Sequence, residues 1–173
     1  MNEYIKIYSN LISVELCQEI INQKDLEFLP ATVDAGDLTS HRNCYNKVLD
    51  KQFESAIFDI VGRALKKYAK DIPTFTLGLT CEDTGYQHLL YKGSEKGEYK
   101  EHTDHFDLHP RILSCSIILN DNYDGGDFTF FKGKYIVKKE AATILMFPSN
   151  FCFPHAVTSV TNGDRHSIVT WFH

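Results

Sequence analysis

The 173-residue sequence predicts an α+β, mainly β fold: a jelly-roll-type double sheet with N-terminal helices packed on one outer face. Two observations predict it. Helical periodicity is confined to residues 1–73, and about eight short β-type runs follow from residue 74 onward. The length is that of one ordinary domain. We therefore expect a single domain, with 1–73 as helical support and 74–173 as the jelly-roll core.

Two helices are expected in the N-terminal part. Ser13 can cap a helix over Val14 to Asn22, and Pro73 should end a second helix. The apolar stripe of that second helix is Phe53, Ile57, Ile60, Val61, Ala64, Leu65 and Tyr68. Residues 31–47, which lie between the two helices, show no period and predict a long loop.

The β-type runs are rich in β-branched and aromatic residues and are separated by turn residues. The expected strands are 74–80, 86–92, 113–120, 127–131, 135–138, 143–147, 155–160 and 165–172. Side chains alternate between the two faces of a strand. In the last strand Arg165, Ser167, Val169 and Trp171 therefore share one face, and Tyr91 shares a face with Gln87 and Leu89 in the earlier one.

Composition excludes several classes of partner. The net charge is −5 and no basic block is present, so a nucleic-acid partner is not expected. No apolar run reaches the length of a membrane span, so no membrane partner is expected. The five cysteines are odd in number and lack a Cys-x-x-Cys pair, which is typical of reduced thiols. We expect a soluble, cytoplasmic protein, and the sequence leaves its oligomeric state open.

A metal site is predicted by His102, Asp104 and His155. Two imidazoles and one carboxylate can occupy one face of an octahedral ferrous ion and leave the other positions open. The pair His102-Thr-Asp104 alone is a weak signal, because His105-Phe-Asp107 follows it at once. The choice between the two pairs depends on the downstream pattern.

That downstream pattern is His155, an Asn162-Gly163 turn, and Arg165 at the start of a strand. A buried arginine requires an anionic partner, and its planar fork suits a carboxylate. Tyr91 could join it on an anion. The alternative is that Arg165 pairs with a structural carboxylate such as Asp164 or Asp127.

The ordered series of motifs resembles the iron and 2-oxoglutarate dependent dioxygenases, and within them the prolyl 4-hydroxylase-like group. The matching pieces are Asn10-Leu-Ile-Ser-Val-Glu-Leu-Cys17, Leu90-Tyr91-Lys-Gly, Gly97-Glu-Tyr99 to His102-Thr-Asp104, Ile118-Leu-Asn120 with Gly125-Gly126, Leu145-Met-Phe147-Pro148, and His155 to Ser167 with Trp171. One departure is Ile117, at a position where some relatives carry a second cosubstrate-binding tyrosine.

The resemblance implies a double-stranded β-helix in which His102, Asp104 and His155 bind Fe(II). Arg165 would pair with the far carboxylate of 2-oxoglutarate, Tyr91 would bond the same carboxylate, and Ser167 would complete the Arg-x-Ser pattern. No catalytic residue beyond the metal ligands is implied. The cofactors would be Fe(II), 2-oxoglutarate and O2, with ascorbate as a further candidate.

The activity implied is hydroxylation of an unactivated C–H bond, with release of succinate and CO2. The substrate would be prolyl or peptidyl, or a small amino-acid-like molecule. Two alternatives remain open: a non-catalytic sensor or scaffold that binds metal or 2-oxoglutarate, and, more weakly, a zinc hydrolase. A zinc hydrolase would not account for an anion-binding Arg165 at a fixed interval after His155.

Overall fold

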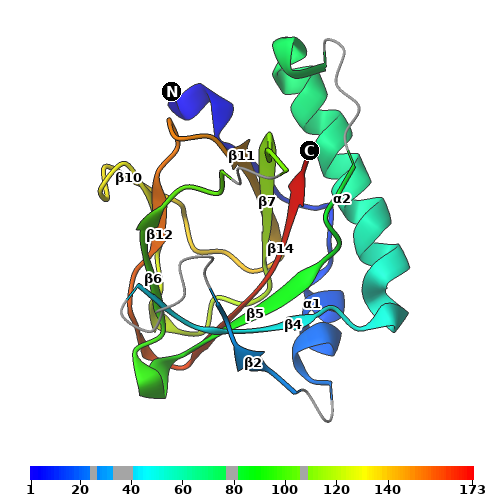
Figure 1. Cartoon of the computed structure of the whole chain (residues 1–173). Coiled ribbons are helices and arrows are strands. Elements are labelled where there is room, and N and C mark those ends of the chain that lie inside the picture. Colours follow the sequence, from blue (N-terminus) through cyan, green and yellow to red (C-terminus); the bar gives the residue numbers. More distant parts are fainter. Residues whose placement is uncertain (24–26, 33–40, 77–81, 106–108) are drawn as a thin grey trace.

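The computed structural model describes residues 1–23, 27–32, 41–76, 82–105 and 109–173. Two antiparallel sheets face one another, and the helices lie outside the larger one (Figure 1). The larger sheet has the order β1 (Lys6–Tyr8), β11 (Thr143–Pro148), β7 (Leu113–Ile118), β14 (Asp164–Phe172), β5 (Gln87–Lys92), β4 (Tyr45–Val48), β2 (Leu29–Pro30). The double sheet confirms the predicted jelly-roll core.

The smaller sheet has five strands and carries two of the predicted metal ligands. Its order is β10 (Tyr135–Ile136), β9 (Phe128–Phe130), β12 (His155–Val157), β6 (Glu98–His102), β3 (Arg42–Asn43). A separate two-stranded ribbon pairs β13 (Val160–Asn162) with β8 (Asp124–Gly125). Short 3-10 helices cover Asn2–Tyr4 (η1), Pro73–Thr76 (η2) and Gly93–Glu95 (η3).

Both predicted helices are present. The Ser13 hydroxyl accepts a hydrogen bond from the Leu16 amide at the start of α1 (Val14–Ile21), which is the expected cap. Asp50 caps α2 (Lys51–Asp71) in the same way through the Gln52 amide. In the described part of the chain, no helix is both long and apolar enough to cross a membrane.

The helices form one hydrophobic core with the outer face of the larger sheet. Ile20 of α1 and Ile57 of α2 are fully buried there, against side chains of β7 and β11 such as Ile117 and Ile144. Burial of such apolar surface supplies most of the stability of these helices. The prediction that the helices cover one sheet is confirmed.

A second core fills the space between the two sheets. Leu89, Tyr91 and Phe147 enter it from the larger sheet, and Phe130 and Val157 enter it from the smaller one. Along β11 the inner residues Leu145 and Phe147 alternate with Ile144 and Met146 of the outer core, as period-two patterning requires. The inner face therefore carries the residues that surround the candidate site.

The predicted loop over residues 31–47 is wrong in its second half. β3 and β4 lie there, with Arg42 opposite Tyr99 of β6 and Tyr45 opposite Leu90 of β5. β3 pairs with β6, and β4 pairs with β5 and β2, so both strands depend on partners outside the segment, and local periodicity does not show them. Residues 33–40 lie outside the described residues. Residues 1–73 thus supply strands as well as helices.

Two strand predictions need correction. Of the expected strand 74–80, the residues up to Thr76 belong to η2, and the rest lie outside the described residues. The expected strand 155–160 is divided into β12 and β13, because the Thr158 hydroxyl accepts a hydrogen bond from the Asp127 amide and the chain then moves to a new partner, β8. β1, β2, β6 and β8 were not predicted either.

Candidate metal centre

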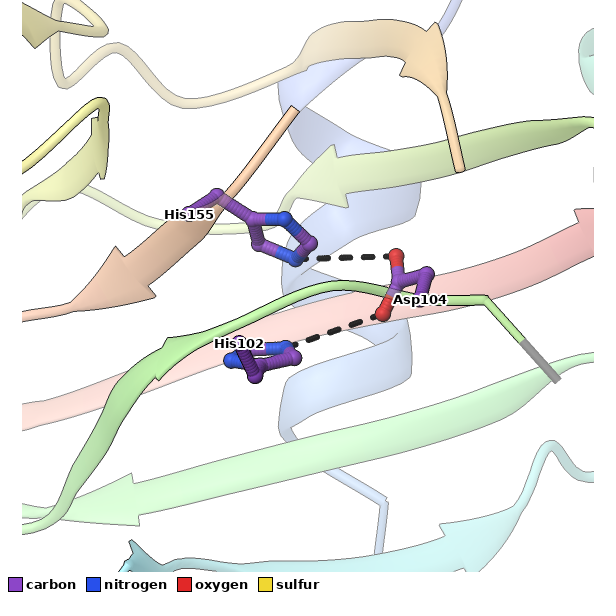
Figure 2. A group of neighbouring side chains, drawn as sticks. All are labelled: His102, Asp104 and His155. Carbon is purple, nitrogen blue, oxygen red and sulfur yellow. Dashed lines mark ion pairs between the residues drawn. The ribbon is translucent and has the colours of Figure 1, made fainter. Parts of the chain in front are cut away.

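His102, Asp104 and His155 converge at one point, as predicted (Figure 2). His155 of β12 lies directly opposite His102, the last residue of β6, and Asp104 follows two residues later. The Asp104 carboxylate oxygens lie 3.6 Å from His102 Nε2 and 3.5 Å from His155 Nε2. One ligand atom of each residue lies within 4.8 Å of the others, a spacing that a single ion can bridge.

Backbone carbonyls fix both imidazoles in one tautomer. His102 Nδ1 lies 2.8 Å from the Lys100 carbonyl oxygen, and His155 Nδ1 lies 3.1 Å from the Phe153 carbonyl oxygen. A carbonyl only accepts, so each Nδ1 must donate. The lone pair of each Nε2 is then directed toward Asp104, which is how metal-binding histidines are oriented in proteins.

The charge states also suit a cation. Burial alone would raise the pKa of Asp104, but His155, His102 and the Ser114 hydroxyl, which donates at 2.7 Å, hold that pKa well below its usual range. Burial lowers the pKa of His155 to about 4. At neutral pH the site therefore holds a carboxylate and a neutral imidazole, the forms that bind metal. Ser114 is held in turn by Ser149, at 2.8 Å between the hydroxyl oxygens.

The three ligands line a cavity of about 290 Å³ between the sheets. Its wall includes Tyr91 and Trp171, both on the faces that strand alternation predicts. His105, from the second His-x-Asp pair, also lines it, whereas Asp107 lies outside the described residues. Two nitrogens and one oxygen that face an open cavity form a donor set that fits Fe(II) with free coordination positions.

Arg165 is buried deep beside this cavity, with 2% of its surface exposed. It lies opposite Tyr91, its guanidinium carbon is 5.0 Å from the centre of that ring, and its Nη1 donates to Ser167 Oγ at 3.0 Å. Its Nε is buried and has no hydrogen-bond partner within the described ranges. A buried, incompletely satisfied guanidinium is costly, so this side chain fits an anionic ligand.

The alternative pairing of Arg165 with a structural carboxylate is wrong for the two candidates named. Asp164 accepts a hydrogen bond from the Gly93 amide, and Asp127 faces Lys139 at 4.0 Å. Within the described residues, no ion pair joins Arg165 to a carboxylate.

Sequence reasoning missed Tyr123, which lies before β8. Burial raises its pKa in spite of a hydrogen bond and an attraction to Arg165, both of which act to lower it. No periodic signal marks Tyr123, because it lies in a turn-rich segment.

Ile117 packs in the outer core, whereas Ile118 faces the inner core, so Ile117 does not lie on the side of the sheet that carries Arg165.

Comparisons with known proteins agree with this geometry. A family model described as the 2OG-Fe(II) oxygenase superfamily matches residues 86–173. Prolyl 3-hydroxylase 2 of Mus musculus is 33% identical over 67 residues, which are 36% of this chain and 10% of that protein. The chain thus covers about a tenth of the length of that relative.

Solved structures share the fold over 98% of this chain. A Trichoplax adhaerens prolyl hydroxylase, in complex with a hypoxia inducible factor peptide fragment, has a TM-score of 0.78 and 17% identity, with 83% of that chain covered. The viral collagen prolyl hydroxylase of Paramecium Bursaria Chlorella virus-1 has a TM-score of 0.74 and 17% identity over 95% of its length. A Pseudomonas putida prolyl-4-hydroxylase has a TM-score of 0.70 and 23% identity over 92%.

Proposed function

Because the chain belongs to the 2OG-Fe(II) oxygenase superfamily, we propose that it is a 2-oxoglutarate-dependent dioxygenase that hydroxylates an unactivated C–H bond. The observation that carries this proposal is the convergence of His102, Asp104 and His155 on a cavity flanked by the buried Arg165. The family implies Fe(II), 2-oxoglutarate and O2 as its cofactors.

In this proposal His102, Asp104 and His155 hold the iron. Arg165 pairs with the far carboxylate of 2-oxoglutarate, and Tyr91, whose pKa is raised by burial, stays protonated and can donate to that carboxylate. Ser167 accepts from Arg165 Nη1 and so positions the guanidinium. The buried walls from Phe128, Phe147 and Val157 keep bulk water from the metal.

Iron bound by these residues would supply the activation of O2, so that one oxygen atom would enter succinate as 2-oxoglutarate loses CO2 and the other would enter the C–H bond of the substrate as a hydroxyl. A prolyl, peptidyl or amino-acid-like substrate is supported by the prolyl hydroxylases that share the fold. Cytoplasmic location and an ascorbate requirement stay predictions.

The test is succinate release after anaerobic loading with Fe(II) and 2-oxoglutarate, followed by addition of oxygen. We expect slow, uncoupled succinate formation in the wild type. Asp104→Ala should abolish it, and Arg165→Ala should raise the 2-oxoglutarate requirement strongly. Asp59→Ala, on the exposed face of α2, is a matched control and should behave like the wild type.

Two outcomes would contradict the proposal. Tight 2-oxoglutarate binding without succinate, across a broad peptide and amino-acid panel, would favour the sensor. Turnover that survives Asp104→Ala but fails in Asp107→Ala would assign the metal to the second His-x-Asp pair.

A further inference from the structure

Arg42 and Arg111 are the two arginines among the described residues that line the cavity. Arg42 lies in β3 at the edge of the smaller sheet, opposite Tyr99 of β6. Its guanidinium carbon is 4.7 Å from the centre of the Tyr99 ring, and that ring stacks on His102 with centroids 3.4 Å apart. One aromatic ring thus joins Arg42 to a metal ligand. Position 42 lies outside the region that the family model matches.

Not all hydrogen-bond donors of the Arg42 guanidinium are used within the described residues. Its Nε donates to Cys44 Sγ at 3.2 Å and its Nη1 to the Thr32 carbonyl at 3.1 Å. Among the hydrogen bonds and ion pairs of the described chain, none uses Nη2 and none joins Arg42 to a carboxylate. An arginine keeps its charge at any physiological pH. A permanent cation with an unused donor nitrogen is therefore part of the cavity wall.

The charges around the cavity leave Arg42 without a counter-charge. Asp104 is the only carboxylate among the described residues that line it. In the proposed function, Asp104 and the near carboxylate of 2-oxoglutarate offset the iron, and Arg165 offsets the far carboxylate. Each negative charge is then matched, and the charges of the two lining arginines, Arg42 and Arg111, remain. Arg111 lies over the Trp171 ring and donates to the Asp104 carbonyl oxygen at 3.4 Å. Arg42, in contrast, lies beside the metal ligand His102 through Tyr99.

From this arrangement we infer that Arg42 binds a carboxylate of the primary substrate and so selects an anionic substrate. The inference rests on the proposed function and adds a substrate class to it. The carboxylate has two sources: the α-carboxylate of a free amino acid, or an Asp or Glu side chain in a peptide. Both fit a planar guanidinium edge, which can donate two parallel hydrogen bonds to the oxygens of a carboxylate.

Ligand binding in the cavity can be followed by the intrinsic fluorescence of the protein. Its single tryptophan, Trp171, lines the same cavity, so a ligand that enters should change the fluorescence. Protein loaded with Fe(II) and 2-oxoglutarate is kept free of oxygen and titrated with matched probes. One set pairs each L-amino acid with its α-amide, and the other pairs capped tripeptides that contain Asp or Glu with their Asn or Gln counterparts. The binding of any probe that does not change the fluorescence is measured by calorimetry.

We expect at least one carboxylate probe to bind about tenfold more tightly than its uncharged counterpart, as a charge-assisted hydrogen bond provides. The set that shows the preference identifies the source of the carboxylate. In Arg42→Gln the preference should disappear, and Arg42→Lys, which keeps the charge, should retain part of it. Arg63→Gln, an exposed arginine on α2, is the matched control and should keep the full preference.

Three results would overturn the inference: no carboxylate preference in any wild-type pair, a preference that survives in Arg42→Gln, or a loss of 2-oxoglutarate affinity in that variant larger than the loss for the probe. Thermal melting of each variant shows whether it is folded. The proposed function fails separately, because succinate release is measured without primary substrate. If the protein prefers carboxylate probes but releases no succinate, the proposed dioxygenase activity would be refuted, and the carboxylate site at Arg42 would still stand.

Discussion

Tyr91 and Arg165 lie directly opposite each other on β5 and β14, and both are buried almost completely. The aromatic ring therefore supports the guanidinium from one side and brings a phenol to the place where a carboxylate would bind. Packing and hydrogen bonding by Tyr91 can be separated, because phenylalanine keeps the ring and removes only the hydroxyl.

Tyr91→Phe should weaken 2-oxoglutarate binding about tenfold, the effect of one hydrogen bond to a charged group. The measurement is an anaerobic titration of the Fe(II)-loaded protein with 2-oxoglutarate. Tyr135→Phe, in β10, serves as the control. An unchanged affinity in Tyr91→Phe would mean that Tyr91 acts only through packing.

Ser114→Ala should weaken metal binding by about 10–100-fold, the usual effect of removing a hydrogen bond that orients a ligand. The Ser114 hydroxyl donates to Asp104 from β7, so its loss frees the carboxylate to rotate and removes a contact that lowers the pKa of Asp104. Competition with a chelator measures the affinity. Ser116→Ala, on the same face of β7, is the matched control. Equal affinities for the two variants would rule out this role of Ser114.

Gly126→Ala should destabilise the fold and displace Arg165. Gly126 has a φ of +63°, and an added Cβ would lie 2.8 Å from Tyr123 Cε2 and 3.2 Å from Arg165 Cδ. Gly133 has a similar φ of +77° but open space around it. Gly133→Ala therefore measures the backbone cost alone, about 1 kcal/mol.

The free energy of unfolding in urea should fall by roughly 1–3 kcal/mol more for Gly126→Ala than for Gly133→Ala, since overpacking has costs of that size. The first variant should also bind 2-oxoglutarate less tightly. Equal losses of stability in the two variants would show that the neighbours of Gly126 move aside without cost.

His88 and His166 should make stability depend on pH. His88 Nε2 lies 3.0 Å from His166 Nδ1 under the Phe28 ring, and burial lowers the two pKa values to about 3 and about 4. Lys47 and Arg165 oppose a charge on this pair, and Asp164 favours one on His166. The unfolded chain takes up protons near pH 6.5, so stability is complete above that pH and declines as the pH falls toward 4.

His88→Gln should remove part of this decline. The loss of unfolding free energy between pH 7 and pH 5 should be about 1–2 kcal/mol smaller in the variant than in the wild type. Urea titrations at the two pH values measure it, with His173→Gln at the exposed C-terminus as the control. The same decline in wild type and His88→Gln would refute the role of the pair.

The parts of the fold that sequence predicted are those set by local chemistry. Ser13 caps α1 with its own hydroxyl, and the two faces of β14 follow from a period of two, neither of which needs a distant partner. β3 and β4 were missed because their ladders are made with β6 and β5, and nothing in Tyr45–Val48 alternates between apolar and polar.

The site divides in the same way. His102, Asp104, His155 and Arg165 were predicted from residue types that bind a metal or a carboxylate and from the order of these residues in the sequence. The structure brings the side chains of the first three together. Arg42 and Tyr123 could not be predicted. Arg42 reaches the cavity, and Tyr123 reaches Arg165, only through the folding of segments that have no periodic pattern. Residues that select a substrate often lie in such segments, and they are therefore the hardest to predict from a sequence.

The position of His155 opposite His102 has a consequence for how the proposed metal centre would be filled. The two imidazoles are 53 positions apart in the sequence and meet only when β12 pairs with β6. A chain still emerging from the ribosome therefore lacks the complete ligand set until most of the domain has been made. An ion that binds the finished site also stabilises the folded chain by mass action. Removal of metal by a chelator should then lower the melting temperature, and metal supply would influence how much of the protein survives in a cell.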